Sequence, residues 1–129
     1  MIAWTRVTEL RDEIGEADFA EVVALFLDEV GGAVANLPCR EGPAEMAAAL
    51  HFLKGAAMNL GFRALAEMCR AHGRTLSAGS PADLSVIAGD VRRCYAASRE
   101  LFLLGLSTRQ TRTEDSVSSS VMSRQTKSA

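Results

Sequence analysis

Residues 51–61 read HFLKGAAMNLG, and they form the centre of a longer helical pattern. Apolar residues recur there every three or four positions, which is the spacing of one face of an α-helix. The residues of this apolar face are Met46, Leu50, Leu53, Ala57 and Leu60. A helix with one continuous apolar face must bury that face against other elements, so the stretch predicts a helix in a packed bundle.

The opposite face of this helix carries residues that a purely structural helix does not need. His51, Lys54 and Gly55 share this face, and Met58 follows one turn later. A glycine inside a helix costs about 1 kcal/mol relative to alanine, so Gly55 needs an explanation. We interpret Gly55 as a gap in the surface that lets another protein approach closely. Neutral imidazole is a good nucleophile near neutral pH, and Lys54 would stabilise an anionic group bound to it.

The same periodicity appears in four other blocks of residues 1–106, separated by connections rich in Gly and Pro. The first block is short and the others are long, and short connections favour antiparallel neighbours. The sequence therefore predicts an all-α fold, an antiparallel up-down four-helix bundle with a short extra N-terminal helix. The repeating positions of the four blocks are Val7, Leu10 and Ile14; Phe19, Val23, Phe26, Val30, Val34 and Leu37; Leu65, Met68, Cys69, His72 and Leu76; and Leu84, Ile87, Val91, Tyr95, Ser98 and Phe102.

Residue type also predicts where two of the helices begin. Pro43 and Pro81 suit the first position of a helix, where the missing N–H is not needed. Ser80 and Asp83 resemble a capping box with Asp in place of Glu. The neighbouring Gly31 and Gly32 weaken the helix that contains them, and the sequence offers no reason for this pair.

Composition limits the class of protein. The chain has 129 residues, 48% of them hydrophobic and 5% aromatic, which suits a single helical domain. Its net charge of −2 gives no general attraction to nucleic acid. Its three cysteines are odd in number and widely spaced, so neither a disulfide framework nor a metal site is predicted. The chain shows no signal peptide and no run of 18 apolar residues, so we expect a cytoplasmic protein without a membrane span.

The C-terminal residues 107–129 differ from the rest of the chain. Eleven of these 23 residues are Ser or Thr and none is aromatic. Such a segment buries too little apolar surface to offset its ordering entropy. We therefore predict two parts, a helical bundle over residues 1–106 and a disordered Ser/Thr-rich tail over residues 107–129.

The central stretch resembles the phosphoacceptor motif of histidine-containing phosphotransfer (HPt) domains of bacterial two-component phosphorelays. That motif reads His-x-Leu-Lys-Gly-small-small-x-x-Leu-Gly, and each of its fixed positions has a counterpart here. The matching residues are His51, Leu53, Lys54, Gly55, Ala56, Ala57, Leu60 and Gly61. Flanking segments are also similar, namely LRDEIGEADFAEVVALFLDEV upstream and FRALAEMC downstream. The resemblance covers about residues 5–106.

This resemblance implies a phosphorelay intermediate and not an enzyme. His51 would accept a phosphoryl group from the aspartate of a receiver domain and pass it to another receiver, with Lys54 stabilising the phosphate charge. The implied partners are receiver domains of response regulators and of a hybrid histidine kinase, with no nucleic acid or membrane. The protein would be a monomer without a cofactor or metal of its own, because Mg²⁺ belongs to the receiver. The residues expected to contact a receiver are Ala48, Gly55, Met58, Asn59, Arg63 and Arg70.

The chain departs from the family pattern at His72 and Gly73, where the family usually has Leu and then Glu. His72 lies on an apolar stripe, so we interpret it as a half-buried core histidine and not as a second acceptor or a metal ligand. Gly73 lowers helix propensity and predicts a local irregularity.

Charge is distributed unevenly along the chain. Residues 1–45 carry a net charge of −7, whereas residues 46–76 carry +3. One helix face holds Arg63, Glu67, Arg70 and Arg74. Two interpretations stay open, an ordinary solvated face and a basic rim that speeds association with an acidic receiver.

Two other classes of protein compete with the phosphocarrier. A non-catalytic helical interaction or scaffold module with a vestigial histidine has no reason to keep Lys54 and Gly55. The dimerising, phosphoacceptor half of a histidine kinase usually has an acidic residue directly after the histidine, where this chain has Phe52.

Overall fold

Five α-helices and one short 3-10 helix make up the computed structural model, which describes the backbone of residues 1–122 and the side chains of residues 1–108. No strand occurs within residues 1–122, where an isolated antiparallel bridge joins Ile2 to Phe62. The predicted all-α fold is confirmed. The elements are α1 (Trp4–Ile14), α2 (Glu16–Ala35), η1 (Leu37–Cys39), α3 (Pro43–Leu60), α4 (Arg63–Ser77) and α5 (Leu84–Met122).

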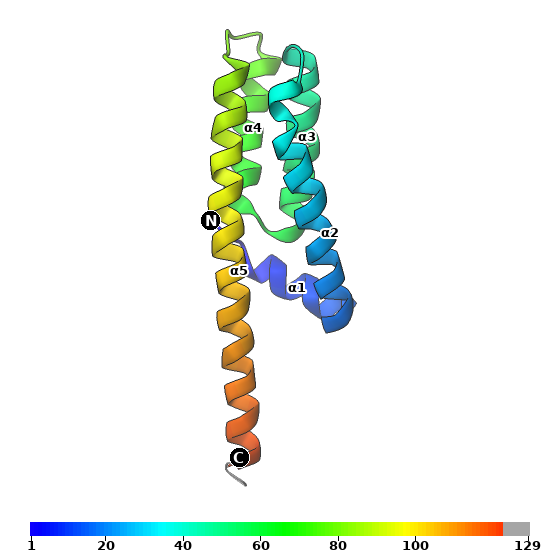
Figure 1. Cartoon of the computed structure of the whole chain (residues 1–129), viewed down its shortest axis with the longest axis vertical. Coiled ribbons are helices and arrows are strands. Elements are labelled where there is room, and N and C mark those ends of the chain that lie inside the picture. Colours follow the sequence, from blue (N-terminus) through cyan, green and yellow to red (C-terminus); the bar gives the residue numbers. More distant parts are fainter. Residues whose placement is uncertain (123–129) are drawn as a thin grey trace. The chain divides into compact units, whose positions relative to one another are not determined.

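Residues 1–99 form one compact unit, and it contains the bundle. In Figure 1, α2, α3, α4 and the first part of α5 run along a common direction, while α1 lies across them. Among these helices, α3 packs most extensively against α4. The arrangement matches the predicted four-helix bundle with a short extra N-terminal helix.

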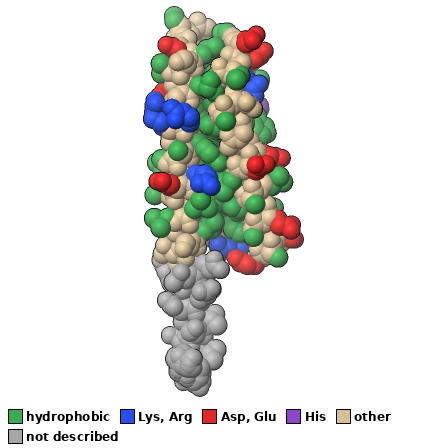
Figure 2. Space-filling view, in the orientation of Figure 1, with side chains coloured by type: hydrophobic (Ala, Val, Ile, Leu, Met, Phe, Trp, Pro, Cys, Tyr) green, Lys and Arg blue, Asp and Glu red, His purple; other side chains and the backbone are tan. Residues whose placement is uncertain are grey.

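The apolar stripes of the helices meet in one core. All five predicted core residues of α3 are at most 1% exposed. Figure 2 shows apolar side chains gathered in the seam between α2 and α5. Because the inward face of α3 is fixed in this way, its opposite face is left for solvent. The buried apolar residues of α1 to α4 and of η1 are Val7, Phe19, Val23, Val30, Val34, Leu37, Met46, Leu50, Leu53, Ala57, Leu60, Leu65, Ala66 and Cys69.

The structure explains why residue 31 is a glycine, which the sequence alone did not. The Tyr95 hydroxyl on α5 donates a hydrogen bond to the Leu27 carbonyl oxygen on α2, at 3.1 Å. A Cβ atom at Gly31 would lie only 3.3 Å from the Tyr95 hydroxyl oxygen. Gly31 therefore lets Tyr95 reach the α2 backbone, whereas a Cβ atom at Gly32 would meet nothing within 4 Å.

The turn between α3 and α4 is held by the N-terminal segment. Gly61 ends α3 in the left-handed conformation, with φ of 89°. The Ala3 N–H donates to the Gly61 carbonyl oxygen at 2.7 Å, and the Ala64 N–H donates to the Met1 carbonyl oxygen at 3.1 Å. A Cβ atom at Gly61 would lie 2.8 Å from the Ala3 carbonyl oxygen, so this position requires glycine for both conformation and space.

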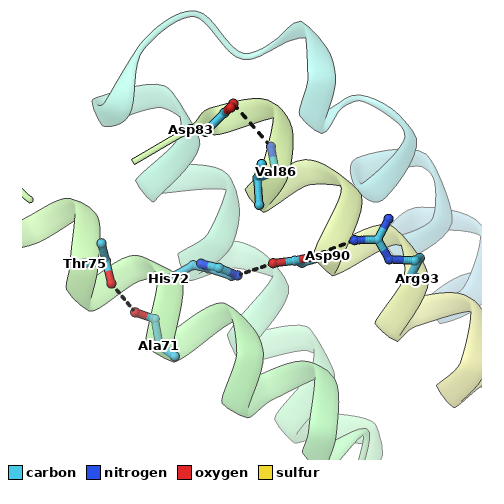
Figure 3. Close-up of polar contacts among 7 residues, drawn as sticks. All are labelled: Ala71, His72, Thr75, Asp83, Val86, Asp90 and Arg93. Atoms are coloured by element: carbon cyan, nitrogen blue, oxygen red, sulfur yellow. Dashed lines mark hydrogen bonds and ion pairs between the residues drawn. The ribbon is translucent and has the colours of Figure 1, made fainter. Parts of the chain in front are cut away.

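One predicted helix start is confirmed and the other is wrong. Pro43 is the first residue of α3, but α5 begins at Leu84 and not at Pro81. The Asp83 side chain accepts a hydrogen bond from the backbone N–H group of Ser85 at 3.0 Å. It accepts a second one from the N–H group of Val86 at 3.4 Å (Figure 3). Asp83 therefore caps α5 by itself, because its carboxylate satisfies two N–H groups of the first turn.

The α5 helix extends beyond the predicted end of the bundle. The sequence predicts a disordered tail from Ser107, whereas the α5 backbone is helical to Met122. Helical hydrogen bonds are internal to the segment, so low apolar content alone does not prevent them. A second unit begins at Glu100, and residues 123–129 lie outside the described structure. The boundary at residue 106 and the order of the tail stay predictions.

One stretch, Glu16–Cys39, is long and apolar enough to cross a membrane by length and composition, with a mean hydropathy of 1.4. It covers α2 and η1. The same stretch supplies Phe19, Val23 and Val30 to the bundle core. A core helix passes this composition test as readily as a spanning helix, so the stretch is weak evidence for a membrane segment.

Candidate functional site

The outward face of α3 presents His51 at the middle of the helix. His51, Gly55 and Met58 are exposed and Lys54 is half-buried, as the helical phase predicts. A Cβ atom at Gly55 would meet nothing within 4 Å, so packing within the protein does not require glycine there. His51 stands on a regular helix whose other face is locked in the core, so its backbone is held rigidly.

Two hollows border α3 and α4, and Lys54 lines both of them; the larger one is also lined by Arg6 of α1. The first, here the His51 hollow, has a volume of about 220 Å³. Its polar lining comes chiefly from His51, Lys54, Arg70 and Arg74, and Gly73 forms part of its wall. The second, here the Met58 hollow, measures about 580 Å³ and is lined by Met58, Arg63, Lys54 and Arg70, among others. Lys54 and Arg70 thus border both hollows.

Five cationic side chains line these hollows. They are Arg6 on α1, Lys54 on α3, and Arg63, Arg70 and Arg74 on α4. One carboxylate, Glu67, is among the residues that line the two hollows, and it pairs with Arg70 within the same helix. The Arg70 hydrogen bond and charge, followed by the charges of Arg74 and Arg63, hold the pKa of Glu67 below its usual value. The α4 side of His51 is therefore basic, with one exposed carboxylate already committed to a cation.

The α2 side of His51 is different in character. A groove lined by Glu29, Asn36, Ala48 and Phe52, here the Phe52 groove, lies between α2 and α3. Phe52 directly follows His51, and half of its surface is exposed. Large exposed apolar side chains next to a reactive group are typical of a protein-binding surface. The sequence analysis did not assign Phe52 to the site, although its place beside His51 on the outward side was a usable signal.

The residues expected to contact a receiver are exposed and lie on two adjacent helices. Ala48, Met58 and Asn59 lie with Gly55 on α3, and Arg63 and Arg70 lie on α4. The Arg6 side chain donates a hydrogen bond to the Asn59 carbonyl oxygen at 2.9 Å, which connects α1 to the end of α3. The structure therefore brings the six predicted residues onto neighbouring surfaces.

His72 occupies a different environment from His51. Its side chain is 24% exposed, and its Nε2 atom lies 3.4 Å from Asp90 Oδ2 on α5. Arg93 donates to the other Asp90 oxygen at 2.8 Å (Figure 3). His72 is thus half-buried as predicted, but it pairs with a carboxylate that the sequence analysis missed. The prediction of a local helix irregularity at Gly73 is wrong, because α4 continues unbroken from Arg63 to Ser77.

The cysteines differ in exposure. Cys39 is exposed, Cys94 is half-buried, and Cys69 is buried beneath the His51 hollow. Burial raises the pKa of the Cys69 thiol to about 12. Among the described residues, no three His, Cys, Asp or Glu side chains are grouped so that they could hold a metal ion.

Comparison with models of known protein families assigns the chain to a family. The sequence model of the Hpt domain matches residues 21–100, more than half of the chain. The protein therefore belongs to the Hpt domain family. Hpt domains carry phosphoryl groups in two-component signalling, interact with receiver domains of response regulators, and contain no kinase or ATP site. A comparison with curated proteins gives no match, and neither does one with solved structures.

Proposed function

We propose that the protein is a phosphorelay intermediate in which His51 is the phosphoacceptor. It takes a phosphoryl group from the aspartyl phosphate of one receiver domain and passes it to the aspartate of another. The observation that carries this assignment is the contrast between the two histidines. His51 is exposed beside Lys54 and two arginines, whereas His72 is half-buried against Asp90.

The transfer step follows from the chemistry of the two groups. A neutral imidazole nitrogen of His51 attacks the phosphorus atom of the receiver's acyl phosphate. A P–N bond forms as the P–O bond to the aspartate breaks, and the receiver's carboxylate leaves. The imidazolium then loses its remaining N–H proton to water. Lys54 stabilises the phosphoryl charge throughout, and transfer to a second receiver reverses these steps.

The surfaces beside His51 suggest how a receiver docks. The open space at Gly55 admits the partner's backbone, while Phe52 and Met58 offer apolar contact and Arg63 offers positive charge. The receiver brings the Mg²⁺ that its own site needs, and the protein contributes no cofactor. We also infer that it acts as a cytoplasmic monomer.

The assignment is tested by mixing the full chain with a phosphorylated receiver and following the phosphoryl group. We expect acid-labile, base-stable label on the wild-type protein and none on His51→Ala. The control is His72→Leu, which changes the only other histidine and should accept label at a similar rate. Label that persists on His51→Ala would exclude His51 as the acceptor. A wild-type protein that binds receivers but never becomes labelled would instead indicate a scaffold with a vestigial histidine.

A further inference from the structure

We propose that the His51 hollow is a phosphoryl-binding site in which Arg70 and Arg74 act together with Lys54. The inference rests on the proposed function, because its ligand is the phosphoryl dianion carried by His51. In this proposal the two arginines bind the phosphoryl group on His51 directly. In the basic-rim interpretation they would only attract an approaching receiver.

The first argument is the composition of the hollow. Three cations line it, one from α3 and two from α4, and its lining contains no carboxylate. Arg70 and Arg74 are one helical turn apart, so they present their guanidinium groups on the same face of α4. The three cations repel one another when the hollow is empty. A dianion bound among them is attracted to all three, and this attraction offsets their mutual repulsion.

The second argument is space. A Cβ atom at Gly73 would meet nothing within 4 Å, so the wall of the hollow is open at that position. The hollow measures about 220 Å³. A water molecule takes about 30 Å³ in the liquid, so a phosphoryl group on His51 fits there together with some of its water.

The third argument concerns Glu67, which pairs with Arg70 on the exposed surface of α4. This carboxylate carries one charge, whereas the phosphoryl group carries up to two and has three acceptor oxygens. Arg70 borders the His51 hollow, so we expect it to exchange Glu67 for the phosphoryl group when His51 is loaded. Glu67 would then hold Arg70 in place while the site is empty.

The expected consequence is a longer lifetime of phosphohistidine. Hydrolysis breaks the P–N bond most readily when the imidazole leaves in its protonated form. Neighbouring cations disfavour ring protonation and favour the phosphoryl dianion. The hollow would therefore protect the phosphoryl group between transfers, and this effect requires no receiver.

The test is a charge comparison at Gly73 in the full-length protein, without a receiver. Phosphoramidate loads His51 by exchanging its P–N bond for a new one, and ammonia leaves. The decay of phosphohistidine and the second pKa of its phosphoryl group are then followed by ³¹P NMR. Gly73→Glu places a carboxylate in the hollow, and Gly73→Gln is the neutral control of the same size.

We expect Gly73→Glu to lose its phosphoryl group about two- to fivefold faster than Gly73→Gln, which corresponds to the free energy of a partly exposed charge pair. The phosphoryl pKa should also be higher in Gly73→Glu. Arg70→Gln and Arg74→Gln should each change both quantities in the same direction as Gly73→Glu.

Equal lifetimes and equal phosphoryl pKa values across these variants would overturn the proposal. Arginine variants that slow transfer from a receiver with an unchanged lifetime would also overturn it, because they would show steering alone. Both outcomes leave His51 as the acceptor. A wild-type protein that phosphoramidate does not label at His51 would instead contradict the proposed function.

Discussion

Gly55 and Gly61 both lie in the central motif, but only one of them is required by the fold. Gly55 has normal helical geometry and open space around it, whereas Gly61 has a positive φ and lies against the Ala3 carbonyl oxygen. Replacing each by alanine therefore separates the needs of the fold from those of the partner.

Gly55→Ala should leave the free energy of unfolding unchanged or raise it by up to about 1 kcal/mol, because alanine is the better helix former. Transfer from a receiver should become slower, because an added methyl group at a tightly packed interface costs about 1–3 kcal/mol. Gly55→Gln should slow transfer further at similar stability. Denaturant unfolding and transfer rates are measured on the same preparations. A clearly destabilised Gly55→Ala protein would show that this glycine serves packing within the bundle.

Gly61→Ala should behave in the opposite way. A non-glycine residue in the left-handed conformation costs about 1–3 kcal/mol, and the new methyl group must also move the Ala3 carbonyl oxygen. We expect a lower midpoint in denaturant unfolding at an unchanged m-value. The comparison with Gly55→Ala controls for adding one methyl group to the same motif. Unfolding at the wild-type midpoint would contradict the described turn.

At the scale of elements, the packing of α4 protects the Cys69 thiol. Its pKa is raised to about 12 by burial, whereas an unfolded thiol ionises near pH 8.5. Between these values the unfolded chain binds fewer protons than the folded protein, so the free energy of unfolding falls as pH rises. Below pH 8.5 the contribution of Cys69 is fully present.

This linkage predicts that the wild-type protein loses stability more steeply above pH 9 than Cys69→Ala does. Cys39→Ala is the matched control, because Cys39 is exposed and should leave the slope unchanged. The measurement is urea unfolding at a series of pH values from 7 to about 11. Identical slopes for wild type and Cys69→Ala would show that the thiol is not protected.

The outward face of α3 could be predicted because it depends on helical phase alone. The geometry of one helix fixes which residues lie with His51 once the apolar face is known. The partners from α4 and α5 depend on how helices pack. The sequence put Arg74 on a basic helix face, but it did not predict that Gly73 and Arg74 line the His51 hollow or that Asp90 lies beside His72. The predicted start of α5 at Pro81 was wrong for a local reason. Ser80 and Asp83 are both residue types that cap helices well, and the structure uses Asp83.

At the scale of the whole molecule, the C-terminal segment offers a direct test. The unit of residues 1–99 carries the His51 site on its surface, and we predict that residues 107–129 contribute nothing to that site. A chain ending at Leu106 should unfold as cooperatively as the full chain and accept phosphate at the same rate. A large loss of either property would show that the C-terminal segment packs or docks.

Two residues line both hollows, and this limits how receiver specificity can change after gene duplication. Lys54 and Arg70 border both hollows, so a substitution at either would alter phosphate handling and partner contact together. Phe52 lines the Phe52 groove and Arg63 lines the Met58 hollow, and neither residue lines the His51 hollow. We therefore expect paralogues to acquire new receivers through changes at Phe52 and Arg63, where partner choice can drift while the lifetime of the signal stays constant.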